Sequence, residues 1–329
     1  YTMHGVNNAT LITNTVLAPD GRLWYIDPIG GGSSKGVLGI YNPEDNSSRR
    51  FVIPVEGVPS GLAMDGNGSL WAPIVQANKV AKFDPASEQF SSFDIPTPSA
   101  RPAGIAADSS GSIWFAEAGA GSIARIDPGT GSITEYKPKS QLQALDEPAA
   151  VFPDPASSNV YIAEHSGHTV TVFNSLLGTF REYPTVNEAG LPFGMALDSY
   201  GNLWFAEHTI DRVGVIDPRT GEGAEAKIPI AGSTIQWITA DDKGKIWFAA
   251  QRGAALGSIT ITAKPSTTPP DDGGQGDGQA GGIPQLPFSF TDVVGPAIAA
   301  GIVISALAYS KSAVDLKRNV RAALKLDRR

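Results

Sequence analysis

Short runs of apolar residues recur along most of the chain, and each run is bounded by turn-forming residues. Six of these runs carry an aromatic residue after an aliphatic one, at intervals of 47, 43, 47, 43 and 43 residues. The aromatic residues are Trp24, Trp71, Trp114, Tyr161, Trp204 and Trp247. The runs show no helical periodicity, and a repeat of this length is typical of a four-stranded β-propeller blade. The pattern therefore predicts an all-β fold, a six-bladed β-propeller.

A turn signal precedes the aromatic residue in most units. A Gly stands three residues before it at Gly21, Gly68, Gly111, Gly201 and Gly244, and an Asp stands six before it at Asp65, Asp108, Asp198 and Asp241. Gly tolerates positive φ, and Asp hydrogen-bonds its own backbone. These segments are therefore expected to be hairpin turns.

The fifth unit shows the expected strands most clearly, at Phe193–Leu197, Leu203–Glu207, Arg212–Ile216 and Ala224–Pro229. The third unit matches it with AGIAA, IWFAE, ARID and SITEY. The sixth unit lacks an obvious fourth strand, so we expect the N-terminal segment to supply that strand and close the ring.

The composition divides the chain into four parts. Residues 1–263 form the propeller, and 264–290 form a Pro/Gly/Asp-rich linker that has too little apolar content for a core. Residues 291–310 are predicted to form a transmembrane helix, and 311–329 a basic amphipathic tail. The start at Tyr1 is what removal of a signal peptide, or shortening of the chain for recombinant expression, would leave.

The membrane segment is predicted from 17 uncharged residues, Val293–Tyr309, which would span ~26 Å as a helix. A buried core helix is the alternative, but the segment lies between a linker without apolar content and a basic tail. The basic residues Lys311, Lys317, Arg318 and Arg321 place the C-terminus in the cytoplasm and the propeller outside.

Small residues follow one side of the predicted span. Ala297, Gly301 and Ser305 are spaced four apart, a pattern that permits close helix packing in lipid. We therefore expect an integral membrane protein partner on this side. The amphipathic tail is expected to lie on the inner leaflet or on a cytoplasmic partner.

Charge and composition narrow the possible partners. The last 19 residues carry 7 basic and 2 acidic side chains, whereas the other 310 carry 18 basic and 31 acidic. This acidic body argues against a nucleic acid partner. The chain has no Cys, which excludes disulfides and thiolate metal sites. Sequons at Asn8, Asn46 and Asn67 are expected to carry glycans if the propeller is exported, with chance occurrence as the alternative.

Carboxylate and imidazole groups follow the second strand in two neighbouring units. Glu164, His165 and His168 belong to the fourth unit, and Glu207 and His208 to the fifth. These side chains are expected on one face near the axis, as a Zn²⁺, Mg²⁺ or Ca²⁺ site or as polar groups bonding neighbouring blades. Glu117 is their counterpart in the third unit, so a ring of acids at the pore mouth is a further possible cation site.

At the level of the repeat the chain resembles the virginiamycin B lyase (streptogramin lyase) family of propellers. The resemblance is carried by VPSGLAMDGNGSLW, by RPAGIAADSSGSIWFAE with ARIDPGTGSITEY, and by LPFGMALDSYGNLWFAE with VGVIDPRTG. It covers roughly residues 16–261 and leaves out the linker and the membrane segment. These motifs mark the blade architecture strongly and an activity weakly.

The resemblance implies a Mg²⁺-assisted elimination that opens a cyclic peptide antibiotic at its ester. It also implies a His base in a Pro-His-Gly or Pro-His-Ala motif and a Glu near the metal. The base must remove a proton next to a carbonyl while the cation stabilises the developing charge. The corresponding positions in this chain hold no His; they are Ser60, Ala103, Ala149, Phe193 and Gln236. Glu147 keeps the acidic residue of a Glu-Pro-His pattern. The number of blades is a further difference, because the family shows seven and this chain six.

The sequence therefore favours a membrane-anchored extracellular propeller without catalytic residues, acting as an accessory or scaffolding subunit of a membrane complex. Its face would bind an extracellular protein or a small ligand. A metal-dependent lyase or hydrolase and a solitary surface receptor are the alternatives.

Overall fold

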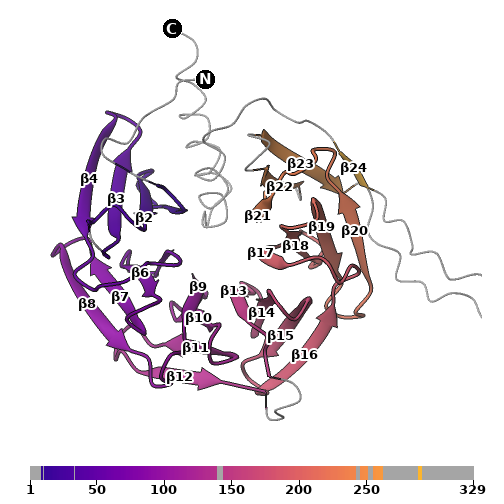
Figure 1. Ribbon diagram of the computed structural model, residues 1–329, viewed down its shortest axis with the longest axis horizontal. Helices are drawn as coiled ribbons and strands as arrows, with labels where there is room; N and C mark the ends of the chain where they lie inside the picture. Colours follow the sequence, from indigo (N-terminus) through magenta and orange to yellow (C-terminus); the bar gives the residue numbers. More distant parts are fainter. Residues whose placement is uncertain are drawn as a thin grey trace, which may run out of the picture.

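The computed structural model describes residue 9, residues 288–290, and residues 11–261 except 33, 139–143, 242–244 and 251–254. These residues form six antiparallel sheets of four strands each. The sheets follow one another around a central axis, as Figure 1 shows. The predicted six-bladed β-propeller with four-stranded blades is confirmed.

Each sheet is one blade, and its strands are hydrogen-bonded in chain order. The first three blades are β1 (Asn14–Leu17), β2 (Leu23–Asp27), β3 (Val37–Asn42) and β4 (Ser47–Val52); β5 (Ala63–Met64), β6 (Leu70–Ile74), β7 (Lys79–Asp84) and β8 (Gln89–Asp94); and β9 (Pro102–Ala107), β10 (Ile113–Glu117), β11 (Ser122–Ile126) and β12 (Ile133–Tyr136). The last three are β13 (Pro148–Pro153), β14 (Asn159–Glu164), β15 (Thr169–Asn174) and β16 (Thr179–Pro184); β17 (Pro192–Leu197), β18 (Leu203–Glu207), β19 (Arg212–Ile216) and β20 (Gly223–Lys227); and β21 (Ile235–Ala240), β22 (Lys245–Ala250), β23 (Ala255–Ile261) and β24 (Phe288–Phe290).

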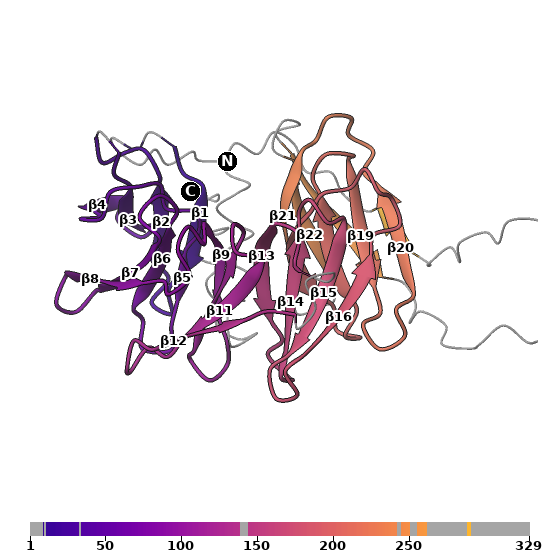
Figure 2. The ribbon, with the colours of Figure 1, turned by 60° about the horizontal axis from the view of Figure 1, so that its bottom comes forward.

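The strand order gives the disc two different faces. First strands such as β9, β13 and β17 lie near the centre, and fourth strands such as β8, β12 and β16 form the rim (Figures 1 and 2). One face carries the loops between second and third strands and the connections between blades; we call it the His face, because His165 and His208 lie there. The other carries the turns between first and second and between third and fourth strands; we call it the Asp face.

In four blades the turn between the first and second strands is held by the Asp that stands six residues before the Trp. In the second blade one carboxyl oxygen of Asp65 accepts from the backbone N–H groups of Asn67 and Ser69, and the other accepts from Trp71 Nε1 at 2.9 Å. The same bond joins Asp108 to Trp114, Asp198 to Trp204 and Asp241 to Trp247, at 2.8, 2.9 and 2.9 Å. Gly68 has a φ of +84°, which Gly adopts without strain. One carboxylate thus fixes both the turn and the indole.

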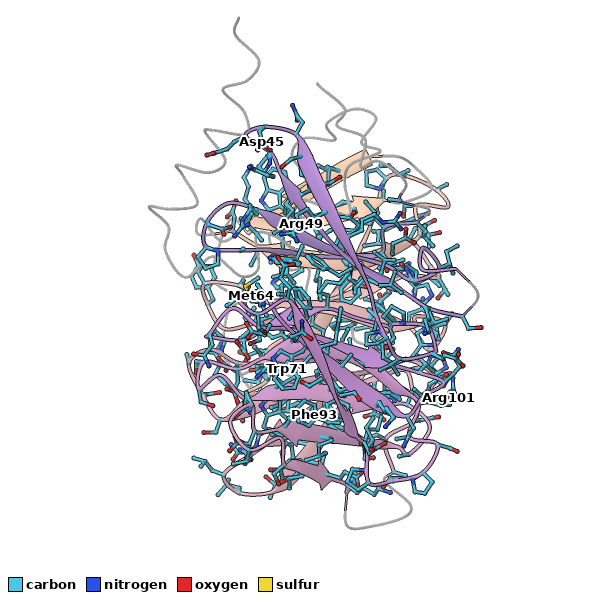
Figure 3. The ribbon with its side chains drawn as sticks, turned by 90° about the vertical axis from the view of Figure 1, so that its left-hand side faces the viewer. Asp45, Arg49, Met64, Trp71, Phe93 and Arg101 are labelled. Atoms are coloured by element: carbon cyan, nitrogen blue, oxygen red, sulfur yellow. The ribbon has the colours of Figure 1, made fainter. Side chains whose placement is uncertain are left out.

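The repeated aromatic residues form the core between blades. Trp71 is fully buried and clusters with Ile113 and Phe115 of the following blade. It also stacks on Phe93 of its own blade, with ring centroids 5.5 Å apart, and Figure 3 labels both residues. Equivalent clusters join each of the first five blades to the next. Burial of this apolar surface is the main driving force for stacking the blades.

The fourth strand of the sixth blade does not come from the N-terminal segment, so that prediction was wrong. It is β24, whose register pairs Ile259 with Phe290 and Ile261 with Phe288. Residues 288–290 were predicted to belong to the linker, and they belong instead to the propeller. The intervening residues are mostly Gly, Asp, Pro and Gln, which have low β-propensity, and β24 includes two Phe residues, which have high β-propensity.

Several predictions fall on other parts of the chain. The membrane segment 291–310, the tail 311–329 and the sequon at Asn8 lie outside the described residues. Within the described ranges, no helix has the length and apolar character needed to cross a bilayer. The sequons at Asn46 and Asn67 both lie in exposed turns on the Asp face.

Replacing Asp65 with Ala is expected to destabilise the propeller by about 2–4 kcal/mol, because the buried Trp71 N–H and two turn N–H groups lose their acceptor. Urea unfolding followed by Trp fluorescence measures the change. Asp20→Ala is the control, since Asp20 contacts only Arg22 in the exposed turn of the first blade, and its cost should stay below about 1 kcal/mol. Equal costs for the two variants would contradict this role of Asp65.

Candidate functional site

The candidate site lies on the His face, where the fourth, fifth and sixth blades meet. His165 follows β14 directly and His208 follows β18, while Phe193 and Trp237 belong to the first strands β17 and β21. The two second strands end beside each other near the centre of the disc (Figure 1). The same register position in two neighbouring blades therefore brings the two imidazoles together, as the sequence predicted.

Four rings form one cluster at this place. The His165 and His208 rings stack with centroids 4.9 Å apart and an interplanar angle of 21°. Phe193 meets both edge-on at 6.2 and 6.0 Å, and Trp237 packs edge-on against Phe193 at 5.1 Å. All four side chains are partly exposed. We call this set the ring cluster, and it offers a ligand apolar faces beside polar ring nitrogens.

A charged group borders the ring cluster on the side of the fourth blade. Glu147 has a positive φ of 52° and accepts a hydrogen bond from Ser166 Oγ. Its carboxylate lies 3.9 Å from His165 Nδ1 and 3.4 Å from a guanidinium nitrogen of Arg101. Arg101 comes from the connection before the third blade and lies on the right-hand face of the disc in Figure 3, which views the disc edge-on. The site thus has an apolar and a charged side.

Hydrogen bonds to backbone carbonyls orient two of the imidazoles. His208 Nδ1 lies 3.3 Å from the Leu191 carbonyl, and His168 Nδ1 lies 2.8 Å from the Gly190 carbonyl. A carbonyl oxygen only accepts, so each Nδ1 carries the proton and, in the neutral ring, Nε2 keeps its lone pair. His168 is therefore tied to the connection between the blades and is not part of the ring cluster.

Burial lowers the pKa of both stacked imidazoles. For His165 the Glu147 carboxylate opposes this effect, and a charge on His168 adds to it. For His208 the positive charge that His165 would carry lowers the pKa further. Both rings are therefore more readily neutral at pH 7 than an exposed imidazole.

The predicted carboxylate ligands point into their own blades. Glu164 accepts from the Asp146 N–H at 2.7 Å and from the Thr171 hydroxyl, and Glu117 accepts from the Ser122 hydroxyl. Glu117 and Glu207 are fully buried, and Glu164 is 2% exposed. They end second strands rather than line the pore, so the predicted ring of acids at the pore mouth was wrong.

A second Glu lies near each of these three carboxyl groups, on the fourth strand of the same blade. The strand registers place Glu135, Glu182 and Glu225 opposite Ala124, Thr171 and Gly214 of the third strands. In the first blade the equivalent positions hold Asp27 and Arg50, which form an ion pair at 3.1 Å. The like-charged pairs of the later blades can hold a hydrogen bond only if one partner is protonated.

The pKa values agree with a proton held between the carboxyl groups. Burial, strengthened by Glu225, raises the pKa of Glu207 to about 8. Burial, reinforced by Glu135 and opposed by the Ser122 hydroxyl, raises the pKa of Glu117 to about 7. Both Glu207 oxygens are buried without a donor among the described side chains and N–H groups, as expected for a protonated carboxyl that bonds to its neighbour.

The five residues predicted as metal ligands are therefore divided between separate places. His165 and His208 meet in the ring cluster, His168 is bound to Gly190, and Glu164 and Glu207 lie inside their blades. Over the described ranges, no three His, Asp or Glu side chains converge as a metal-binding group.

Strand register also locates the positions where the virginiamycin B lyase family would carry its base. Pro102, Pro148 and Pro192 pair with the last residue of the neighbouring second strand, as Ile235 pairs with Ala250. The following residues are structurally equivalent; they are Ala103, Ala149, Phe193 and Gln236. The assignment of Gln236 in the degenerate sixth unit is thus confirmed, and none of these side chains is an imidazole.

Trp237 is the site residue that sequence reasoning missed. The second to fifth blades hold Gly61, Gly104, Ala150 and Gly194 at its position, because the first strands pack closely around the axis. A Cβ on Gly194, for example, would lie 2.5 Å from the Gln236 carbonyl oxygen. A Trp at a position that is otherwise small was the available signal.

A cavity lies at the axis beneath the ring cluster. Its volume is about 1010 Å³, and it is lined by first-strand residues such as Gly104, Ala150 and Trp237 and by turns of the Asp face such as those at Asp65 and Asp108. Trp237 belongs both to this lining and to the ring cluster. The arrangement suits binding of a group that inserts at the axis.

The fold defines a six-bladed β-propeller that carries a cluster of partly exposed rings on its His face. The model of the virginiamycin B lyase family matches residues 11–158 and 139–270, which is more than half of the chain. The chain therefore belongs to the virginiamycin B lyase family. No curated protein sequence matches it.

Solved structures agree on the fold. A catalytically inactive His→Ala variant of virginiamycin B lyase from Staphylococcus aureus with quinupristin is 22% identical, with a TM-score of 0.69 over 79% of this chain and 84% of that one. Hydrazine synthase from Kuenenia stuttgartiensis is 14% identical, with a TM-score of 0.60 over 79% and 80%. The extracellular domain of a one-component system from B. thetaiotaomicron is 18% identical, with a TM-score of 0.56 over 75% and 33%.

Raising the pH is expected to destabilise the propeller. The pKa of Glu207 is about 8 when folded and about 4.3 when unfolded, so its stabilising contribution is complete below the unfolded value and is lost as pH rises through about 8. Between about pH 6 and 9 the free energy of unfolding should fall by about 3 kcal/mol from this group. Glu207→Gln should flatten the fall in urea titrations, and an unchanged slope would rule out the shared proton.

The stacked imidazoles are expected to titrate as a pair. In NMR titrations, both His165 and His208 should show pKa values below that of an exposed His, about 6.5. His165→Ala should raise the pKa of His208, because burial and the neighbouring positive charge are both reduced. His168→Ala, which leaves the stack intact, serves as the control. A pKa of His208 that does not respond to His165→Ala would show that the rings do not interact.

Proposed function

We propose that this protein binds a partner rather than catalyses a reaction, and that it does so as a membrane-anchored extracellular propeller in a membrane complex. The observation that carries the proposal is the set of side chains at the family's base positions. The five positions hold Ser60, Ala103, Ala149, Phe193 and Gln236, none of which removes a proton from carbon at neutral pH.

The placement of the Glu residues also weakens the alternative of a metal-dependent lyase or hydrolase. Such a site needs carboxylate and imidazole groups that converge on one ion. Glu164 and Glu207 face their own blades while His165 and His208 face the axis, so the donors are directed to different places. His208 Nε2 remains a possible proton acceptor, and it is the atom on which this alternative depends.

The proteins that share this fold differ widely in what their names describe, from a lyase to hydrazine synthase and the extracellular domain of a one-component system. Fold alone therefore does not decide the function. The ring cluster favours binding, because partly exposed aromatic rings supply large contact area at low entropic cost. A protein segment or a small ligand with an apolar group suits this place.

Anchoring in the membrane rests on the sequence. The apolar segment 291–310 and the basic residues after it support a single span with the propeller outside. The row of Ala297, Gly301 and Ser305 supports contact with another membrane helix. The protein would then hold a rigid disc above its membrane partner.

Extraction of membranes with mild detergent is expected to recover the protein together with an integral membrane partner. Gly301→Leu should abolish this association, because the bulky side chain separates the two helices. Ala299→Leu, which changes the opposite side of the predicted helix, is the matched control. Recovery of the protein alone as a monomer would refute the role as a subunit.

The enzyme alternative has its own test on the purified ectodomain. We expect no bound divalent metal by elemental analysis, and no ester opening of a cyclic depsipeptide with Mg²⁺ added. A stoichiometric metal that is lost in the His165→Ala/His208→Ala double variant would favour the enzyme.

A further inference from the structure

The last strand of the propeller determines the direction in which the chain leaves the disc. β24 is antiparallel to β23, with Thr260 opposite Ser289 and Ile259 opposite Phe290. β23 begins at Ala255, after the connection on the His face, and runs toward the Asp face. The chain in β24 therefore runs back toward the His face, and Phe290 lies nearer to that face than Phe288.

The pairing of β24 also changes the distance to the predicted membrane span. If the linker were free, 31 residues (262–292) would separate Ile261 from Val293, with a mean reach of about 30 Å. With β24 in place only residues 291 and 292 separate Phe290 from Val293, a reach of about 10 Å at most. The sixth blade is therefore held at the membrane surface.

The two faces differ in charge. Every turn between a first and a second strand carries an Asp on the Asp face, namely Asp20, Asp65, Asp108, Asp154, Asp198 and Asp241. In the turns of this face that the structure describes, the basic side chains are Arg22 and Arg219, and each is paired with a neighbouring Asp. An anionic lipid surface repels such a face. Glycans on Asn46 and Asn67 would also need free space there.

The His face offers groups that suit lipid headgroups. Ile29, Val58 and Val186 lie in its loops and are 55%, 37% and 43% exposed. Lys35, Arg101 and Lys137 lie in its loops and connections, and Arg101 is paired with Glu147. The described acidic residues of these loops are Glu56, Asp146, Glu147, Glu188 and Asp211, so this face is less acidic than the Asp face. Surfaces that rest on a bilayer usually carry both exposed apolar and basic side chains.

We propose that the propeller lies on the outer surface of the bilayer with its His face toward the lipid headgroups, an arrangement that rests on the membrane anchoring proposed above. The ring cluster then faces the lipid headgroups. The Asp face is turned outward.

One feature of the Asp face favours the opposite orientation of the disc. Leu176 and Leu177 in the β15–β16 turn are 82% and 74% exposed, and the equivalent turns of the first, second, third and fifth blades are polar. If these side chains insert into lipid, the Asp face is the one that faces the bilayer. The experiment must therefore compare exposed apolar positions on both faces.

Single cysteines can report the orientation without background, because the chain has none. Full-length Ile29→Cys and Val186→Cys represent the His face, and Leu176→Cys and Tyr200→Cys are matched exposed positions on the Asp face. Each carries a fluorophore in vesicles of phosphatidylcholine and phosphatidylglycerol with a nitroxide-headgroup lipid. We expect at least twofold stronger quenching at the two His-face positions.

A second measurement tests the docking of β24. Thr260→Cys with Ser289→Cys should form a disulfide readily, because the two residues are direct register partners. Thr260→Cys with Gln285→Cys, a position before β24, is the control pair and should form it less.

The possible outcomes distinguish failure of the proposed orientation from failure of the proposed membrane anchoring. Equal quenching on both faces, or stronger quenching at Leu176→Cys, would overturn the orientation even if the disulfide forms. Failure of the Thr260/Ser289 pair to cross-link would overturn the short attachment on which the orientation depends. Extraction of the whole chain from membranes by alkaline carbonate would instead refute the membrane anchoring itself.

Discussion

In four of the six blades one carboxylate joins a turn to an indole, and this is the interaction that links the surface turns to the core between blades. Asp65 illustrates it, since one oxygen satisfies the turn N–H groups and the other the Nε1 of a Trp that is packed against the next blade. A surface turn and the core between blades are thereby fixed by a single side chain. Because the unit recurs, packing between neighbouring blades brings the first strands together around the axis, where residues such as Phe193 and Trp237 contact one another.

The sequence predicted most of this because the repeat itself is local. In the fifth unit the second and third strands were predicted with the bounds that the structure shows, and the first was one residue short. The hydrogen bonds of Asp198 explain why, since its turn and Trp204 are separated by only a few residues. Contacts between residues that are close in the chain can be predicted from a single sequence.

Features that depend on distant pairing were harder to predict. β24 follows a stretch of 26 residues without strand-forming composition, so no local signal connects it to β23. The buried Glu pairs were missed for a related reason, because Glu207 and Glu225 meet only across the third strand. The sequence placed His165 and His208 together correctly through the repeat, but it could not show that the neighbouring carboxylates turn the other way.

The pairing of β24 with β23 has a consequence for a cut in the chain between these two strands. Because Ile261 pairs with Phe288, the chain returns to the same sheet edge that it leaves after β23. A protease that cuts between the two strands would therefore not separate the two parts of the chain at once. The parts would stay associated through three residues of strand pairing, and their separation would be governed by the dissociation of that short strand.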